Sequence, residues 1–202
     1  MSPRRSVADA LETRRRIVER SVDVGTLEGL EILSFGRLAD DLGMSKSGVL
    51  RHFDTKEALQ LAAIEAATGA FAERMAARVR GSERGLERLL ALCDGWIEDV
   101  IERQPAGGCF FTAVSTEFDG RPGPVRDAIA AALRTWQDAL AAEVRRAVAL
   151  GQLPESTDVA QVVFELGGLV MGLNQRLLLR GDRRAPTRAR RAVRRILGVA
   201  AA

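Results

Sequence analysis

The residues best suited to specific chemistry lie in one short stretch, Gly43 to Leu59, which reads GMSKSGVLRHFDTKEAL. This stretch contains both lysines of the chain, Lys46 and Lys56, and its only histidine, His52. Short hydroxyl side chains and cations on one helix can enter a DNA major groove, where bulky acids would be repelled. Lysine binds phosphate as a compact charge on a flexible stem. The stretch therefore predicts contact with nucleic acid.

Two short helices joined by a tight turn would have to hold these residues. Ser34 and Ser45 are suited to capping the two helices, and Gly43 between them can take the left-handed backbone conformation. Ala39 is small enough for the helices to approach each other, and Val49 returns an apolar side chain to their shared core. These spacings predict a helix-turn-helix.

The second helix of this motif should project hydroxyls, a glycine and cations, and basic residues of the first helix should flank them. Lys56, at the start of the next helix, adds a cation beside backbone amides that also attract phosphate. The alternative is an ordinary solvated helix. The predicted DNA contacts are Arg14, Ser34, Ser45, Lys46, Ser47, Gly48, Arg51, His52 and Lys56.

The longer segment FGRLADDLGMSKSGVLRHFDTKEAL resembles the DNA-binding signature of the TetR family of transcriptional repressors. The resemblance is specific over residues 17–61. Phe53, Thr55 and Lys56 match the end of the family motif, whereas Leu50 stands where a tyrosine is common. The resemblance implies a homodimer that binds double-stranded DNA and responds to a small-molecule effector.

The rest of the chain is predicted to be helical, because apolar residues recur at helical spacing and no alternating run is convincing. We expect an all-α fold of about nine helices, the first from about Asp9 to Val24. Three N-terminal helices form the helix-turn-helix domain, residues 1–56, and a long helix to about Arg80 joins it to a helical bundle. The bundle, residues 57–202, is the predicted effector-binding and dimerisation domain.

Large or polar residues on the predicted inward faces of the bundle are the candidates for an effector pocket. Each of them is more often plain core than a ligand contact. Together they suit an apolar or aromatic ligand, with Glu117 and Asn174 as its polar anchors. The candidates are Met75, Trp96, Phe110, Phe111, Glu117, Trp136, Met171 and Asn174.

For the dimer interface, the stretch ELGGLVMGLNQRLLL places Gly168 and Gly172 one helical turn apart, where small residues allow close packing of helices. Packing within the chain is the alternative. Residues 176–202 carry nine basic and one acidic side chain. Such a tail often marks a contact with nucleic acid or membrane, so an RNA- or membrane-surface-binding protein is an alternative function. A DNA-binding protein without an effector is the nearer alternative.

Other classes of protein are not favoured by the sequence. No phosphate-binding glycine loop or catalytic triad is present, so we expect no enzymatic activity and no cofactor. One histidine and two unclustered cysteines, Cys93 and Cys109, do not favour a metal site, and the cysteines read as small buried hydrophobes rather than a redox switch. The first residues have no apolar stretch of the kind expected in a signal peptide, and the apolar stretch Val162 to Leu173 reads as too short to span a membrane. We therefore expect a cytoplasmic protein.

Overall fold

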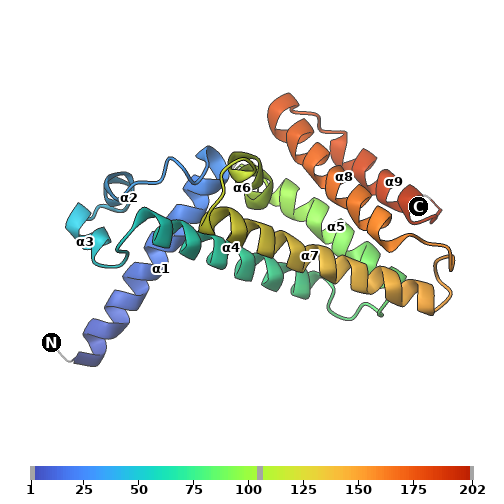
Figure 1. The fold of residues 1–202 in the computed structure, drawn as a ribbon, viewed down its shortest axis with the longest axis horizontal. Helices are drawn as coiled ribbons and strands as arrows, with labels where there is room; N and C mark the ends of the chain where they lie inside the picture. The colour runs from blue at the N-terminus through green and yellow to red at the C-terminus, as the bar shows by residue number, and fades with distance from the viewer. Residues whose placement is uncertain (1–2, 104–106, 201–202) are drawn as a thin grey trace. The chain divides into compact units, whose positions relative to one another are not determined.

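The computed structural model describes residues 3–103 and 107–200, and these residues form nine helices and no strand (Figure 1). The predicted all-α fold of about nine helices is confirmed. The helices are α1 (Pro3–Glu28), α2 (Phe35–Leu42), α3 (Lys46–Leu50), α4 (Lys56–Arg78), α5 (Leu86–Glu102), α6 (Phe110–Phe118), α7 (Pro124–Ala149), α8 (Val159–Arg180) and α9 (Ala185–Ile196).

The chain divides into two compact units. Unit 1 comprises Met1–Ala70 and Ala113–Ala130, and unit 2 comprises Phe71–Thr112 and Ala131–Ala202. Helices α4, α6 and α7 contribute residues to both units, because the division falls within each of them. The predicted boundary at residue 56 separates a DNA-binding domain from an effector-binding and dimerisation domain. The division into compact units does not test these functions, so the boundary stays a prediction.

Helix α1 is longer than the sequence pattern indicates, since it begins at Pro3 and continues through Gly25 to Glu28. Two ion pairs at helical spacing, from Arg15 to Glu12 and to Glu19, support its exposed N-terminal half. The helix ends where Gly29 takes a φ of 93°. A glycine is therefore tolerated inside α1, and the next one terminates it.

The core of unit 1 includes the helix-turn-helix contacts expected from the sequence. Leu38 and Ala39 on α2 are buried, and so is Val49 on α3. Ile17 on α1 and Leu59 on α4 are fully buried as well. Helix α2 packs against α3 and against α1, so the helix-turn-helix is joined to the first long helix.

In unit 2, helix α9 packs against α5 and α8. Its buried residues Ala185, Ala189 and Val193 recur every four positions, so the basic C-terminal segment is an amphipathic helix with its apolar side in the core. Arg190 on its polar side pairs with Asp94 and Glu98 of α5. Part of the positive charge of this segment is therefore neutralised within the bundle.

Helix α8 is longer than the apolar stretch from which the sequence prediction was made. By length and composition alone it could cross a membrane, a test that core helices of soluble proteins also pass. One side of it is buried at Val162, Leu166, Val170 and Leu173. The expectation that this segment is too short to span was therefore wrong in length, because further residues extend the helix on both sides of the apolar stretch.

Candidate functional site

The caps of α2 and α3 form as the sequence predicts. The hydroxyl of Ser34 accepts a hydrogen bond from the backbone N–H of Arg37 at 3.1 Å, and that of Ser45 accepts one from Gly48 at 3.1 Å. Gly43, which ends α2, has a φ of 65° in the left-handed region. The two serine hydroxyls therefore cap the N-terminal ends of α2 and α3. A DNA contact by either serine would have to use the same oxygen as the cap.

Several exposed polar side chains, two of them cationic, lie on α3 and at the residue directly after it. Lys46, Ser47 and Arg51 are exposed, and no residue of the described chain forms an ion pair with either cation. A Cβ on Gly48 would lie 3.2 Å from the Ser45 hydroxyl, so a glycine leaves the cap undisturbed. The exposed cations can bind phosphate or base edges without first breaking an internal ion pair.

Arg14 and His52, two predicted DNA contacts, are joined to each other. The Arg14 guanidinium donates to the backbone carbonyl of His52 at 2.6 Å and lies 4.1 Å from the centroid of the Phe53 ring. The His52 side chain is half-buried. Arg14 thus fastens α1 to the turn after α3, which is a structural contact that the sequence did not indicate.

Lys56 lies at the first position of α4, where the sequence prediction placed it. Its ammonium donates to the backbone carbonyl of Glu31 and lies 3.4 Å from the Glu31 carboxylate. The cap of this helix is Thr55, whose hydroxyl accepts a hydrogen bond from the backbone N–H of Ala58 at 3.0 Å.

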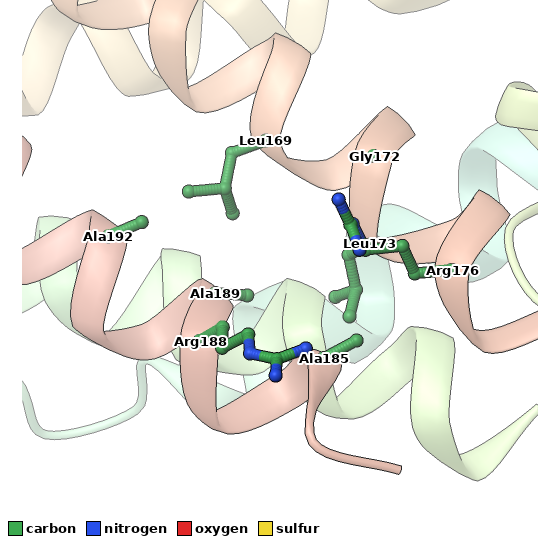
Figure 2. Close-up of a pocket in the computed structure, with 8 residues that line it drawn as sticks. All are labelled: Leu169, Gly172, Leu173, Arg176, Ala185, Arg188, Ala189 and Ala192. Carbon is green, nitrogen blue, oxygen red and sulfur yellow. The ribbon is translucent and has the colours of Figure 1, made fainter. Parts of the chain in front are cut away.

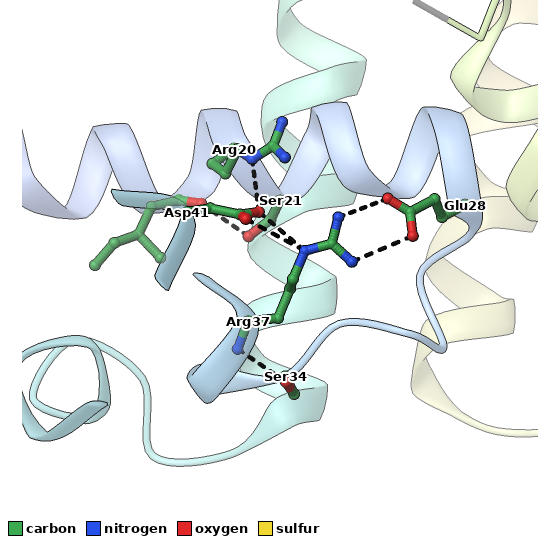
Figure 3. A network of polar contacts seen from close by, with 7 residues as sticks. Arg20, Ser21, Glu28, Ser34, Arg37 and Asp41 are labelled. Carbon is green, nitrogen blue, oxygen red and sulfur yellow. Dashed lines mark hydrogen bonds and ion pairs between the residues drawn. The ribbon is translucent and has the colours of Figure 1, made fainter. Parts of the chain in front are cut away.

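Ion pairs between α1 and α2 neutralise acidic side chains of both helices (Figure 3). Arg37 donates to Glu28 at 2.7 Å and to Asp41 at 3.1 Å, and Arg20 donates to Asp41 at 2.9 Å. The hydrogen bond from Arg37 lowers the pKa of Glu28. Desolvation raises the pKa of Asp41, but hydrogen bonds from Arg20 and Arg37 outweigh it and the pKa is lowered. Both acids are paired within the unit, which reduces the negative charge that unit 1 presents.

In unit 2, four of the aromatic side chains form a contiguous cluster. The ring centroids of Trp96 and Trp136 are 5.2 Å apart, those of Phe71 and Trp136 are 4.9 Å apart, and those of Phe71 and Phe111 are 6.3 Å apart. Phe110 extends the cluster at 5.3 Å from Phe111. All these pairs meet edge to face, the geometry that ring quadrupoles favour.

Both indole N–H groups of this cluster are buried without a hydrogen-bond partner in the described chain. A buried donor without an acceptor is costly, and native proteins usually satisfy such groups. The N–H groups of Trp96 and Trp136 are therefore two donors within the aromatic cluster that the described chain leaves without an acceptor. An acceptor supplied by a ligand would satisfy them.

The structure brings most of the predicted pocket residues to this region of unit 2. Met75 is 3 % exposed and belongs to the same buried core as Trp96. Asn174 is also buried, but its side-chain oxygen accepts from the backbone N–H of Cys109 at 3.0 Å. Asn174 thus supports the start of α6, and its amide nitrogen is the part left for a ligand.

Two predicted pocket residues do not face inward with the others. Met171 is 48 % exposed, because the buried side of α8 passes through Val170 and Leu173, and both residues between them are exposed. Glu117 lies in unit 1, where its carboxylate binds the backbone N–H groups of Leu30 and Glu31 at 2.7 and 2.9 Å. The assignment of these two residues to an inward face with the aromatic cluster is corrected.

The sequence interpretation missed two contributors. Phe71 was not among the pocket candidates, although its ring meets those of both Phe111 and Trp136. Its position one turn before Met75 was the available signal. Arg37, which joins Glu28 to Asp41, had no signal beyond its charge, because Glu28 is 9 residues away in sequence.

The two cysteines are buried in the core of unit 2. Burial, reinforced by the neighbouring Asp94 charge, raises the pKa of the Cys93 thiol to about 12. A thiol in this state carries almost no thiolate at neutral pH and is a poor nucleophile. Cys93 therefore acts as a small apolar side chain.

The outer side of α8 is apolar and open. Phe164 is 77 % exposed, and Met171 and Leu178 follow it at spacings of seven residues with exposures of 48 and 41 %. No described atom lies within 4 Å of the position that a Cβ on Gly168 or Gly172 would take. No neighbouring helix of the described chain therefore packs against either glycine, and their place in a dimer interface stays a prediction.

A groove of about 470 Å³ lies beside this side, between α8 and α9 (Figure 2). Its lining combines small side chains, two leucines and two arginines. The residues that line it are Leu169, Gly172, Leu173, Arg176, Ala185, Arg188, Ala189 and Ala192.

A helix-turn-helix in one unit and an aromatic-lined helical bundle in the other define the class of DNA-binding transcriptional regulators. Residues 85–193, more than half of the chain, match the family described as "Tetracyclin repressor-like, C-terminal domain". The chain belongs to this family, the TetR family of transcriptional regulators. No curated protein matches the sequence.

Solved structures with a similar fold are regulators of the same kind. A TetR transcriptional regulator from Chloroflexus aurantiacus J-10-FL has a TM-score of 0.84 at 21 % identity, over 92 % of this chain and 94 % of its own. A TetR-family regulator from Cytophaga hutchinsonii has a TM-score of 0.83 at 21 % identity, over 94 % and 95 %. A putative regulator from Saccharomonospora viridis, in complex with choline, has a TM-score of 0.77 at 21 % identity, over 93 % and 96 %.

Proposed function

We propose that this regulator is a repressor that binds a near-palindromic operator as a homodimer and leaves it when a small, largely apolar effector binds in unit 2. The single observation that carries the proposal is the pair of exposed cations, Lys46 on α3 and Arg51 directly after it, neither of which forms an ion pair within the described chain. In this proposal the protein acts in the cytoplasm, needs no cofactor and catalyses no reaction.

On the DNA side, Lys46, Ser47 and Arg51 enter the major groove. Lys56 contacts phosphate at the N-terminus of α4, where backbone amides add to the attraction. Ser34, Ser45, Gly48 and His52 form the surrounding contact surface. Arg14 supports this surface from α1 and reaches the DNA only if its contact with the His52 carbonyl is exchanged.

The dimer forms through the outer sides of α8 and α9. Phe164, Met171 and Leu178 give an apolar stripe that is unusual on a protein surface, and the glycines within it allow a second helix to approach. A second copy related by a two-fold axis presents the same stripe, so the surface can pair with itself. Two recognition helices then meet a two-fold symmetric site.

The effector occupies the aromatic cluster of Phe71, Trp96, Phe111 and Trp136, with Met75 and Phe110 beside it. The two buried indole N–H groups favour a molecule that carries a hydrogen-bond acceptor on an apolar frame. Choline, bound in the Saccharomonospora viridis structure, is a quaternary ammonium that aromatic faces can hold instead. Choline therefore belongs in the screen as a competing chemical class.

Helix α4 connects the two activities, because it begins at Lys56 in the proposed DNA surface and reaches Met75 of the bundle core. An effector that binds the DNA-incompetent arrangement more tightly would tilt this helix and change the spacing of the recognition helices. A coupling free energy of roughly 1–3 kcal/mol is typical of such linkage.

The test of the effector site is tryptophan emission during a ligand screen, followed by DNA release. A ligand that quenches emission and releases DNA from the wild type supports the proposal. Trp136→Phe retains the ring and removes one indole N–H, so it should weaken an acceptor-bearing ligand by about 0.5–1.5 kcal/mol while DNA affinity stays unchanged. DNA binding that no ligand releases would favour the effector-independent alternative.

The alternative function is RNA or membrane binding through the arginine-rich C-terminal segment. Truncation of this segment is not a suitable test, and substitutions are needed instead. Removing α9 would expose the core residues that it covers. Exchanging the exposed Arg191 and Arg195 for glutamine removes charge and leaves the buried side intact. Loss of binding to duplex DNA in this variant, together with binding of the wild type to anionic vesicles or RNA, would favour the alternative.

A further inference from the structure

The carboxylate of Glu117 closes a clamp on the turn that follows α1. It accepts hydrogen bonds from two consecutive backbone N–H groups, those of Leu30 and Glu31, at 2.7 and 2.9 Å. These residues are 87 and 86 positions from Glu117 in sequence. A carboxylate that accepts two amide hydrogens forms charge-assisted bonds, which are stronger than neutral ones.

Gly29 gives an independent sign that this clamp is a built feature. Its φ of 93° favours glycine, and a Cβ there would lie 2.6 Å from a carboxylate oxygen of Glu117. The turn therefore leaves space for the carboxylate by omitting a side chain. Gln60 of α4 completes the turn by donating to the carbonyl of Leu30 at 2.9 Å from a buried position.

The clamped turn also holds Lys56. The backbone carbonyl of Glu31 accepts from the Lys56 ammonium, and one carboxylate oxygen of Glu31 lies 3.4 Å from it. The other carboxylate oxygen lies 3.6 Å from Arg121, just after α6. Glu31 is thus held by Glu117 of α6 through its backbone N–H. Through its backbone carbonyl it holds Lys56, a proposed phosphate contact.

Glu117, whose carboxylate forms the clamp, lies near the C-terminal end of helix α6. Phe110 and Phe111 at its start belong to the aromatic cluster, and Glu117 is six residues beyond Phe111, about 9 Å along the helix axis.

We propose that Glu117 is a positioning residue that sets the Lys56 ammonium for phosphate contact by clamping the N–H groups of Leu30 and Glu31. The inference rests on the proposed DNA contact of Lys56. The clamp gives α6 a direct polar link to the DNA surface, beside the path through α4.

The test compares Glu117→Gln, Lys56→Ala and the double variant on a mixed-sequence DNA duplex over a series of salt concentrations. In the clamp each N–H bonds to a different carboxylate oxygen, and a glutamine replaces one of these oxygens by an NH2 group, which is a donor and cannot accept the N–H that faces it. We expect both single variants to reduce the slope of log affinity against log salt by about 0.9 for each phosphate that the protein no longer neutralises. The double variant should reduce it no further, because both changes act on the same phosphate.

Glu73→Gln is the matched control. Glu73 is exposed on α4, and its exchange removes the same charge. Loss of one negative charge alone should leave the slope unchanged and DNA binding equal or tighter, which is opposite in sign to the effect expected of Glu117→Gln.

A second variant changes the clamp without altering charge. Gly29→Ala pushes a methyl group against the carboxylate and should also reduce the slope. A Glu117→Gln variant that unfolds more easily but keeps the wild-type slope, with additive effects in the double variant, would overturn the inference and leave the proposed function standing. A wild-type chain that binds no duplex would overturn both.

Discussion

Lys46 and Arg51 carry charges that no described residue neutralises. Their removal should therefore change the affinity for DNA rather than the stability of the fold. We expect Lys46→Ala and Arg51→Ala each to weaken binding to a selected operator by about 1–3 kcal/mol, the usual effect of removing a side chain that binds a base. Exposed positions of this kind change stability by no more than about 0.5 kcal/mol. Fluorescence anisotropy with labelled duplex and thermal unfolding measure the two effects.

Arg191→Ala provides the control for these two variants, because Arg191 is an equally exposed cation on α9. It should leave operator affinity near the wild-type value. An unchanged affinity for Lys46→Ala, at a salt concentration where the wild type binds specifically, would show that α3 is not the recognition helix.

The Cys93 thiol should be inert in the folded protein. Its pKa is raised to about 12 by burial and by the charge of Asp94, so the thiolate is scarce at neutral pH. We expect a thiol reagent to react with neither cysteine of the native protein faster than the chain unfolds, and with both after denaturation. Rapid labelling of the native protein at neutral pH would contradict this buried, structural role.

At the scale of elements, the network around Arg37 should make the junction of α1 and α2 sensitive to acid. The pKa values of Glu28 and Asp41 are lowered in the folded state from ordinary values of 4.5 and 3.8. The stability that they contribute is therefore present above these ordinary values and lost as pH falls through the lowered ones. Arg37→Met should lower the free energy of unfolding at neutral pH, and the difference from wild type should shrink below about pH 3.8.

Urea unfolding of both proteins across this pH range measures the difference. Arg126→Met is a suitable control, because Arg126 is an exposed arginine of the same unit outside this network. A gap between wild type and Arg37→Met that is equally wide in acid and at neutral pH would mean that packing of the arginine stem, rather than its ion pairs, provides the stability.

The helix-turn-helix could be predicted from the sequence because its signals are local. The caps by Ser34 and Ser45 and the turn at Gly43 each depend on residues within three or four positions. Met171 was misplaced because a shift of one residue from Val170 turns a side chain by about 100° around a helix. Glu117 was misassigned because its partners lie in a turn 86 and 87 residues away, and no spacing in the sequence links them.

At the scale of the whole molecule, the open side of α8 predicts association of two chains. A Cβ at Gly172 meets no described atom within 4 Å, so Gly172→Leu should leave the single chain folded. It should nevertheless block close approach of a second α8 and shift the protein from dimer to monomer. Light scattering at micromolar concentration measures the change in mass.

Gly69→Leu is the matched control for the dimer, because Gly69 is another helical glycine, on α4, with no described atom within 4 Å of its Cβ position. This variant should remain dimeric. A wild-type protein that is monomeric both free and on DNA would exclude the proposed two-fold arrangement.

The central claim, that α3 reads DNA as part of a two-fold dimer, is tested most directly by recovering the duplexes that the purified protein selects from a random library. The account predicts one enriched, near-palindromic site with half-sites roughly one helical turn, about 34–36 Å, apart. It also predicts that Lys46→Ala no longer enriches this site. Failure of the wild type to enrich any sequence, or enrichment of the same site by Lys46→Ala with equal affinity, would contradict it.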